Sequence, residues 1–90
     1  MRVAAAPNPI AGSGEIRFAL PSAGRARVMM FDASGRRVRE LADRSFSSGP
    51  HALRWDGRDD RGRAVAAGIY FTRLETDERR VDSKVVLIRP

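Results

Sequence analysis

The segment between Trp55 and Phe71 constrains the fold more than any other part of the chain. Trp55 ends a short apolar stretch, a run rich in Asp, Gly and Arg follows, and the aromatic pair Tyr70 and Phe71 opens the next apolar stretch. Strands bounded in this way by large apolar residues and joined by Asp and Gly are typical of the corner of a small β-sandwich. The segment therefore predicts an all-β fold.

Alternating apolar residues predict strands elsewhere in the chain. Residues 15–20 and 25–31 have a period of two, which predicts half-buried strands with these inward side chains: Ile16, Phe18 and Leu20 in the first, and Ala26, Val28 and Met30 in the second. Residues 37–46 fit a bent strand about as well as a helical turn, and their neighbours favour a strand. Further strands are expected over residues 51–55, 69–75 and 83–89, with an N-terminal linker or edge strand within residues 1–7. We predict a single domain over residues 1–90, folded as an immunoglobulin-like or fibronectin III-like β-sandwich of about seven short strands.

Two short segments carry the same turn chemistry. Asp32 precedes Gly35 by three residues, Asp59 precedes Gly62 by three, and an arginine follows each glycine. An aspartate in such a position accepts a hydrogen bond from the backbone two residues on, and the glycine supplies the positive φ that closes a hairpin loop. We therefore predict two loops of one type, and two copies are too few for a solenoid.

The charge and the composition exclude several classes of protein. The formal net charge is +6, but the arginines are spread evenly along the chain, whereas a nucleic-acid binder gathers them on one face. We predict no specific nucleic-acid partner. The chain has no cysteine, so it has neither a disulfide nor a thiolate ligand. It has no apolar run long enough to span a bilayer and no secretion signal, so we expect no membrane insertion and expect the chain to be a C-terminal segment of a longer parent.

The candidate metal and catalytic residues favour structural roles. Asp56, Asp59 and Asp60 lack the alternating spacing and the late glutamate of a calcium loop, and arginines lie among them, so backbone capping is the better interpretation. His51 is the only histidine, and no serine lies in a nucleophile elbow. We predict no catalytic, metal-binding or cofactor-binding residue.

The aromatic residues suggest a core and leave one alternative open. Tyr70 resembles the tyrosine corner of sandwich domains, in which the hydroxyl bonds back to the backbone. Trp55 is expected in the core, because a carbohydrate-stacking platform needs several coplanar exposed aromatic rings and most phenylalanines here are at inward registers. Carbohydrate binding remains a possibility on the analogy of fold alone.

The order of these residues resembles the immunoglobulin-like domain of the flagellar hook-capping protein FlgD. It is equally similar to the related C-terminal modules of large secreted bacterial proteins, including type IX secretion sorting domains. The resemblance covers residues 7–89, with one departure at Ile10, where such modules commonly carry Phe. The residues that carry it, which we expect to form a structural motif, are Asn8, Pro9, Asp32, Gly35, Trp55, Asp56, Gly57, Asp59, Gly62, Gly68 and Tyr70.

The resemblance implies a function as well as a fold. It implies a non-enzymatic structural or sorting module of an exported bacterial protein, secreted or at the cell surface, without a cofactor. Its partners would be proteins, either export machinery or neighbouring domains of the parent chain. The alternative is an accessory domain that binds carbohydrate or another surface polymer and is attached to a secreted enzyme.

Overall fold

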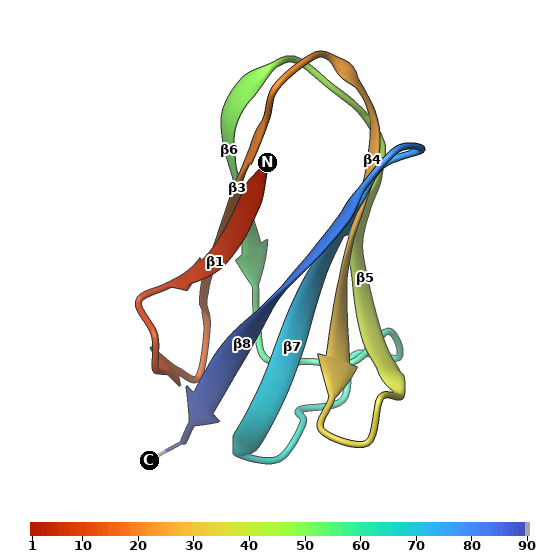
Figure 1. Cartoon of the computed structure of the whole chain (residues 1–90). Coiled ribbons are helices and arrows are strands. Elements are labelled where there is room, and N and C mark those ends of the chain that lie inside the picture. The colour runs from red at the N-terminus through yellow and green to blue at the C-terminus, as the bar shows by residue number, and fades with distance from the viewer. Residues whose placement is uncertain (90) are drawn as a thin grey trace.

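The chain forms two β-sheets that face one another, as the computed structural model of residues 1–89 shows (Figure 1). Within these residues there are eight strands: β1 (Arg2–Ala6), β2 (Ile10–Ala11), β3 (Gly14–Leu20), β4 (Gly24–Asp32), β5 (Arg37–Phe46), β6 (Gly49–Trp55), β7 (Gly68–Glu75) and β8 (Arg80–Ile88). The predicted all-β sandwich is confirmed. The strand beyond the expected seven is β2, whose two residues are too few to give a periodic signal.

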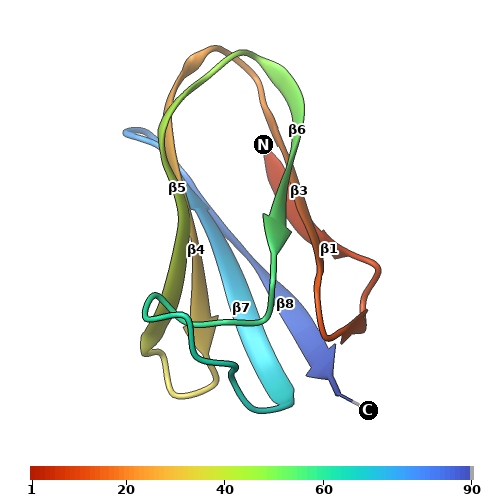
Figure 2. The ribbon, with the colours of Figure 1, turned by 180° about the vertical axis from the view of Figure 1, so that it is seen from behind.

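The sheets contain three and five strands. Their orders are β1-β3-β6 and β2-β8-β7-β4-β5, and Figure 2 shows the two layers from behind. Neighbouring strands are antiparallel except β2 and β8, which are parallel. The ambiguous segment Arg37–Phe46 is strand β5, an edge strand whose pairing with β4 contains two register shifts. Such bulges protect an edge strand from pairing with other chains.

The core lies between the two sheets and contains every inward residue that the alternation predicts. Ile16, Phe18 and Leu20 on β3 are buried, as are Ala26, Val28 and Met30 on β4. Two of the four phenylalanines, however, lie on the outer side of the five-stranded sheet. Phe31 and Phe71 are register partners there, so the expectation that most phenylalanines face inward is wrong.

The N-terminal residues link the two sheets. β1 is an edge strand of the three-stranded sheet, as one of the two expectations for residues 1–7 had it. The chain then crosses to the edge of β8. There the side-chain amide of Asn8 makes the hydrogen bonds that the backbone of a neighbouring strand would make. Its Oδ1 accepts a hydrogen bond from the Val86 N–H (3.0 Å), and its Nδ2 donates to the Lys84 carbonyl (3.0 Å). Pro9 follows directly, and β2 begins at Ile10. Residues 1–89 include no helix long and apolar enough to cross a membrane.

Candidate functional site

The two loops with the Asp-Gly spacing lie at the same end of the sandwich (Figure 2). In the first, between β4 and β5, Asp32 Oδ1 accepts hydrogen bonds from the backbone N–H groups of Ser34 and Arg36, both at 3.0 Å. The Gly35 N–H donates to the Asp32 carbonyl at 3.0 Å, and Gly35 has a φ of +89°. Only glycine adopts this conformation readily, so the glycine is required to close the turn.

The second loop repeats this geometry. Asp59 Oδ1 accepts from the N–H groups of Arg61 and Arg63, both at 2.9 Å. The Gly62 N–H donates to the Asp59 carbonyl at 3.0 Å, and Gly62 has a φ of +81°. The arginine after each glycine also approaches its own aspartate, with Arg63 Nε 3.3 Å from Asp59 Oδ2 and Arg36 Nε 3.6 Å from Asp32 Oδ2. The two loops are therefore one structure used twice.

The hydrogen bonds at the loops lower the pKa values of both aspartates. For Asp32 the main cause is the Ser34 hydroxyl, which donates at 2.6 Å, followed by the Arg36 N–H. For Asp59 the main cause is the Arg63 N–H. A carboxylate that receives several N–H or O–H donors is stabilised in its charged form. Both side chains act as backbone caps, and residues 1–89 contain no cluster of three or more histidine or carboxylate side chains placed to hold a metal ion.

The second loop is also docked against the edge of β5. The Asp60 N–H donates to the Val38 carbonyl at 3.0 Å, and the Asp60 carboxylate accepts from the Glu40 N–H at 2.9 Å. Asp56 accepts from the Arg58 N–H at 3.1 Å and from the Arg39 guanidinium at 3.0 Å. Asp60 thus pairs with backbone groups of an edge strand that has no strand neighbour on that side.

Trp55 and Gly57 fix the start of the second loop from inside. Trp55 is fully buried, and its indole N–H donates to the Arg58 carbonyl at 3.1 Å. Gly57 has a φ of +71°, and a Cβ atom there would lie 2.3 Å from the Gly12 carbonyl oxygen. The Arg89 guanidinium donates to the carbonyls of Gly57 and Val65, both at 2.7 Å. A buried indole cannot stack on a sugar, so Trp55 offers no carbohydrate platform.

Tyr70 connects the loop end to the core. Its ring packs edge-on against Trp55 with centroids 5.5 Å apart, and its hydroxyl donates to the Ala66 carbonyl, two residues before Gly68 begins β7. Burial raises the pKa of Tyr70, and the nearby charge of Asp32 acts in the same direction. Tyr70 therefore keeps its proton and donates this hydrogen bond, in the geometry of a tyrosine corner.

The hollow between the two loops has a volume of about 670 Å³ and a mixed charge. Its carboxylates, Asp32, Asp59 and Asp60, already accept backbone hydrogen bonds, as described above. Arg36, Arg37, Arg61 and Arg63 surround them. No serine, threonine or histidine in the hollow is placed as a nucleophile with an adjacent base. The geometry of this end is that of a structural corner.

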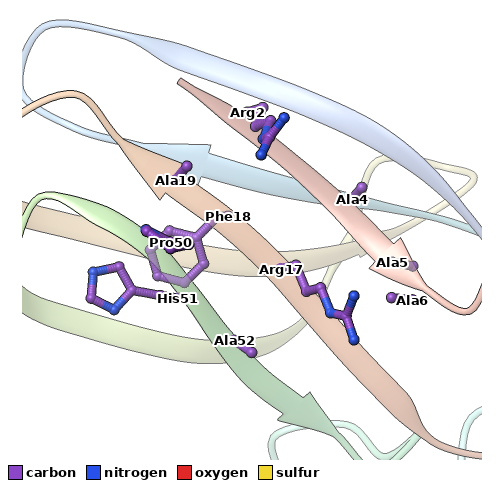
Figure 3. A pocket seen from close by; sticks show the side chains of 10 residues that line it. All are labelled: Arg2, Ala4, Ala5, Ala6, Arg17, Phe18, Ala19, Pro50, His51 and Ala52. Atoms are coloured by element: carbon purple, nitrogen blue, oxygen red, sulfur yellow. The ribbon is translucent and has the colours of Figure 1, made fainter.

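A second hollow, of about 630 Å³, lies on the outer side of the three-stranded sheet (Figure 3). Alanines from all three strands line it, together with Arg2 and Arg17. Arg17 is paired with Glu15 at 3.0 Å. We call this surface the alanine face, defined by Arg2, Ala4, Ala6, Arg17, Ala19, Pro50 and Ala52.

His51 lies beside this hollow but is directed toward the core border. Its ring stacks on Phe18 with centroids 5.2 Å apart, and its Nε2 lies 2.8 Å from the Ser47 carbonyl oxygen. No carboxylate shares a hydrogen bond with the ring in residues 1–89. His51 therefore packs as a strand residue that borders the core.

Comparison with known proteins identifies the family. A model of the FlgD Ig-like domain matches residues 8–79. The chain belongs to this family. No curated protein matches the chain. FlgD from Xanthomonas campestris is 30% identical with a TM-score of 0.64, and the match covers 93% of this chain and 60% of that one.

Two proteins from Porphyromonas gingivalis share the fold. Dimeric latent PorU has a TM-score of 0.74 at 20% identity, and the match covers 98% of this chain and 9% of PorU. PorZ, a surface component of the type IX secretion system, has a TM-score of 0.62 at 22% identity, with coverages of 97% and 11%. The chain thus spans about a tenth of the PorU and PorZ chains and less than two thirds of FlgD.

Three residues have partners at the site that were not apparent from the sequence. Asp60 docks the second loop on β5, Arg89 bridges two loop carbonyls, and Asn8 caps the edge of β8. Arg89 and Asn8 act on residues that lie 24 to 78 positions away, and no local pattern marks such pairs. The sequence did indicate structural roles for Asn8, as part of the expected motif, and for Asp60, as a backbone cap, but it did not indicate their partners.

Proposed function

We propose that this chain is a non-enzymatic structural or sorting module of an exported bacterial protein and acts by protein–protein recognition. The observation that carries the proposal is the match to the FlgD Ig-like domain over residues 8–79. The known proteins that share the fold assemble at or beyond the cell surface: FlgD caps the flagellar hook, and PorZ belongs to the type IX secretion system.

The site supports a structural role rather than a chemical one. The aspartates of both loops accept backbone hydrogen bonds, Trp55 is buried, and Tyr70 donates to a carbonyl. We expected these side chains to carry the family resemblance, and all of them are used to build the corner. What remains for recognition is the outer surface of the two sheets.

The proposal includes the setting of the chain. The module would be the C-terminal part of a longer exported protein, and its partners would be export machinery or neighbouring domains of that parent. The location would be the medium or the cell surface. The role of a surface-polymer binder is less well supported, because the only tryptophan is fully buried.

Export of the parent protein tests the proposal. The parent is expressed in its own host with and without residues 8–90, and its amount is measured in cells, at the surface and in the medium. A control keeps the domain and carries Asp77→Ala, a change in the exposed turn between β7 and β8, away from the outer surfaces of the sheets. We expect the truncated parent to stay folded but to remain inside the cell. Normal export of the truncated parent would contradict a sorting role, and loss of attachment to a surface polymer alone would favour the alternative.

A further inference from the structure

The large apolar side chains that remain exposed in residues 1–89 all lie on one face. Ile69, Phe71 and Ile88 are 44%, 38% and 48% exposed, respectively. They occupy outward positions at the start of β7 and the end of β8. Single exposed apolar residues are ordinary, but a group gathered on one face marks an interaction surface.

The strand register makes this group continuous. Phe71 pairs with Phe31 on β4, and Ile69 pairs with Val86 on β8. Ile88 follows Val86 on the same face, because alternate residues of a strand point to the same side. Phe31 and Val86 are half-buried. We call Phe31, Ile69, Phe71, Val86 and Ile88 the apolar patch.

The carboxylates on this face are already paired with arginines. Beside the patch, Asp82 Oδ1 lies 2.9 Å from Arg73 Nε, and the Arg73 guanidinium lies over the Phe31 ring at 4.5 Å. The other outward carboxylates of the sheet are also in ion pairs: Glu40 with Arg37, and Asp43 and Glu75 with Arg27.

Two cations on the face have no such partner. Lys84 is the register neighbour of Phe71, and Arg80 lies further along β8. Neither makes an ion pair within residues 1–89. Lys84 therefore places an unpaired positive charge beside the patch, and the outward carboxylates of the sheet are all paired.

We propose that the apolar patch docks a protein surface with apolar side chains at its centre and Asp or Glu at its edge. A carboxylate placed opposite Lys84 would find an unpaired cation there. A second copy of this chain would instead bring Lys84 against a sheet face whose carboxylates are already paired, and the net charge of +6 on each copy opposes the approach. The proposal rests on the proposed role in protein recognition and names the surface that performs it.

The alanine face is the natural internal control. It also carries arginines, but no large apolar side chain is exposed on it. Arg2 is an exposed cation there without an ion pair in residues 1–89, which matches Lys84. A substitution of Arg2 changes the net charge as one of Lys84 does, but far from the patch.

The test uses the purified 90-residue chain and three synthetic helical peptides. The first has leucines on one face and glutamates at its edges, the second has lysines for the glutamates, and the third has serines for the leucines. Binding is measured by calorimetry and by amide NMR shifts at low and high salt. We expect only the Leu/Glu peptide to bind, with shifts at Ile69, Phe71 and Val86, and we expect salt to weaken the binding.

Variants locate the binding surface. Phe71→Ser should weaken binding about 10-fold or more, because truncating an apolar anchor at an interface typically has this effect. Lys84→Gln should weaken it about 3-fold at low salt, and Arg2→Gln should leave it unchanged. A thermal melt of each variant confirms that the change is not one of folding.

Four binding results would overturn the inference. These are no binding of the Leu/Glu peptide, equal binding of the Leu/Lys peptide, unchanged affinity of Phe71→Ser, or NMR shifts confined to the alanine face. Concentration-dependent sedimentation that Phe71→Ser abolishes would assign the patch to a second copy and would equally overturn it. Since export is not measured here, any of these results would leave the sorting proposal standing on its own test.

Discussion

The two Asp-Gly loops have the same internal hydrogen bonds but different support from the rest of the fold. The first joins β4 to β5, which are paired neighbours, so its two ends are held by the hairpin itself. The second lies in the connection from β6 to β7, which belong to different sheets. Its position depends on Trp55, Gly57, Asp60 and Arg89. The local sequence determines the shape of a loop, whereas distant residues determine where that loop lies.

This difference predicts which substitutions act on one loop and which act on both. Changes to the aspartates and the glycines inside the loops should have similar effects in the two copies. Of the two loops, changes to the supporting residues should affect only the second. Stability measurements on paired variants separate the two classes.

Trp55→Ala should have the largest effect. It removes a fully buried indole from the core and its hydrogen bond to the Arg58 carbonyl, so we expect a loss of about 3 to 5 kcal/mol in the free energy of unfolding. A domain of this size has little more than that to lose. Urea denaturation followed by circular dichroism measures the change. Near-native stability would show that the second loop and the core do not depend on the indole.

Gly57→Ala should be next in size. The new Cβ would lie 2.3 Å from the Gly12 carbonyl oxygen, and the backbone there already has a positive φ, so we expect a loss of about 2 to 4 kcal/mol. Gly12→Ala is the matched control, because Gly12 has a φ of +76° but nothing within 4 Å of a new Cβ. The difference between the two variants in urea denaturation measures the steric contribution. Equal losses would show that the close approach is relieved by a small shift.

Gly35→Ala and Gly62→Ala test whether the loops are equivalent. Each places a Cβ at a positive φ with open space around it, so each should lose roughly 1 to 2 kcal/mol. Gly24→Ala, at a position of ordinary φ and open space, is the control and should change stability less. A markedly larger loss for Gly62 would mean that its loop transmits the strain to the docked contacts.

These residues also show how far the sequence predicts the fold. Period-two alternation identified the inward residues of β3 and β4, because burial on one face of a strand leaves a local pattern. The Asp-Gly spacing identified both loops, because their hydrogen bonds join residues two to four positions apart. The hydrogen-bond partners of Asn8 and Arg89 could not be predicted, since each side chain bonds to a residue more than 20 positions away.

The apolar patch is a feature that the sequence did not predict. The pairing of Phe31 with Phe71 depends on the register of β4 against β7, which the sequence does not specify. An apolar alternation alone does not show which outward residues gather into a surface. The docking surface was therefore visible only after the strands were paired.

Asp60→Ala should affect the second loop alone, by about 1 kcal/mol. It removes the acceptor for the Glu40 N–H at the edge of β5, while the Asp60 N–H can still donate to Val38. Asp77→Ala, at the β7–β8 turn, is a control for the loss of one surface charge. Chemical denaturation should separate the two variants. If they are equally stable, the docking contact at β5 contributes nothing measurable to the fold.

The smallest effect should be the acid dependence that the two loops share. Folding lowers the pKa values of Asp32 and Asp59, so each contributes stability that is fully present above the pKa of an unfolded aspartate, about 3.9, and is lost as the pH falls through the lower folded value. Thermal melts between pH 7 and pH 2 should show this decline. Asp32→Asn and Asp59→Asn remove the titrating group and should each flatten it, because each carboxylate accepts two backbone N–H groups in its own loop and Asp32 accepts the Ser34 hydroxyl as well. A decline that only one variant flattens would show that the loops differ electrostatically in spite of their common geometry. A decline that neither flattens would assign the acid sensitivity to the surface ion pairs instead.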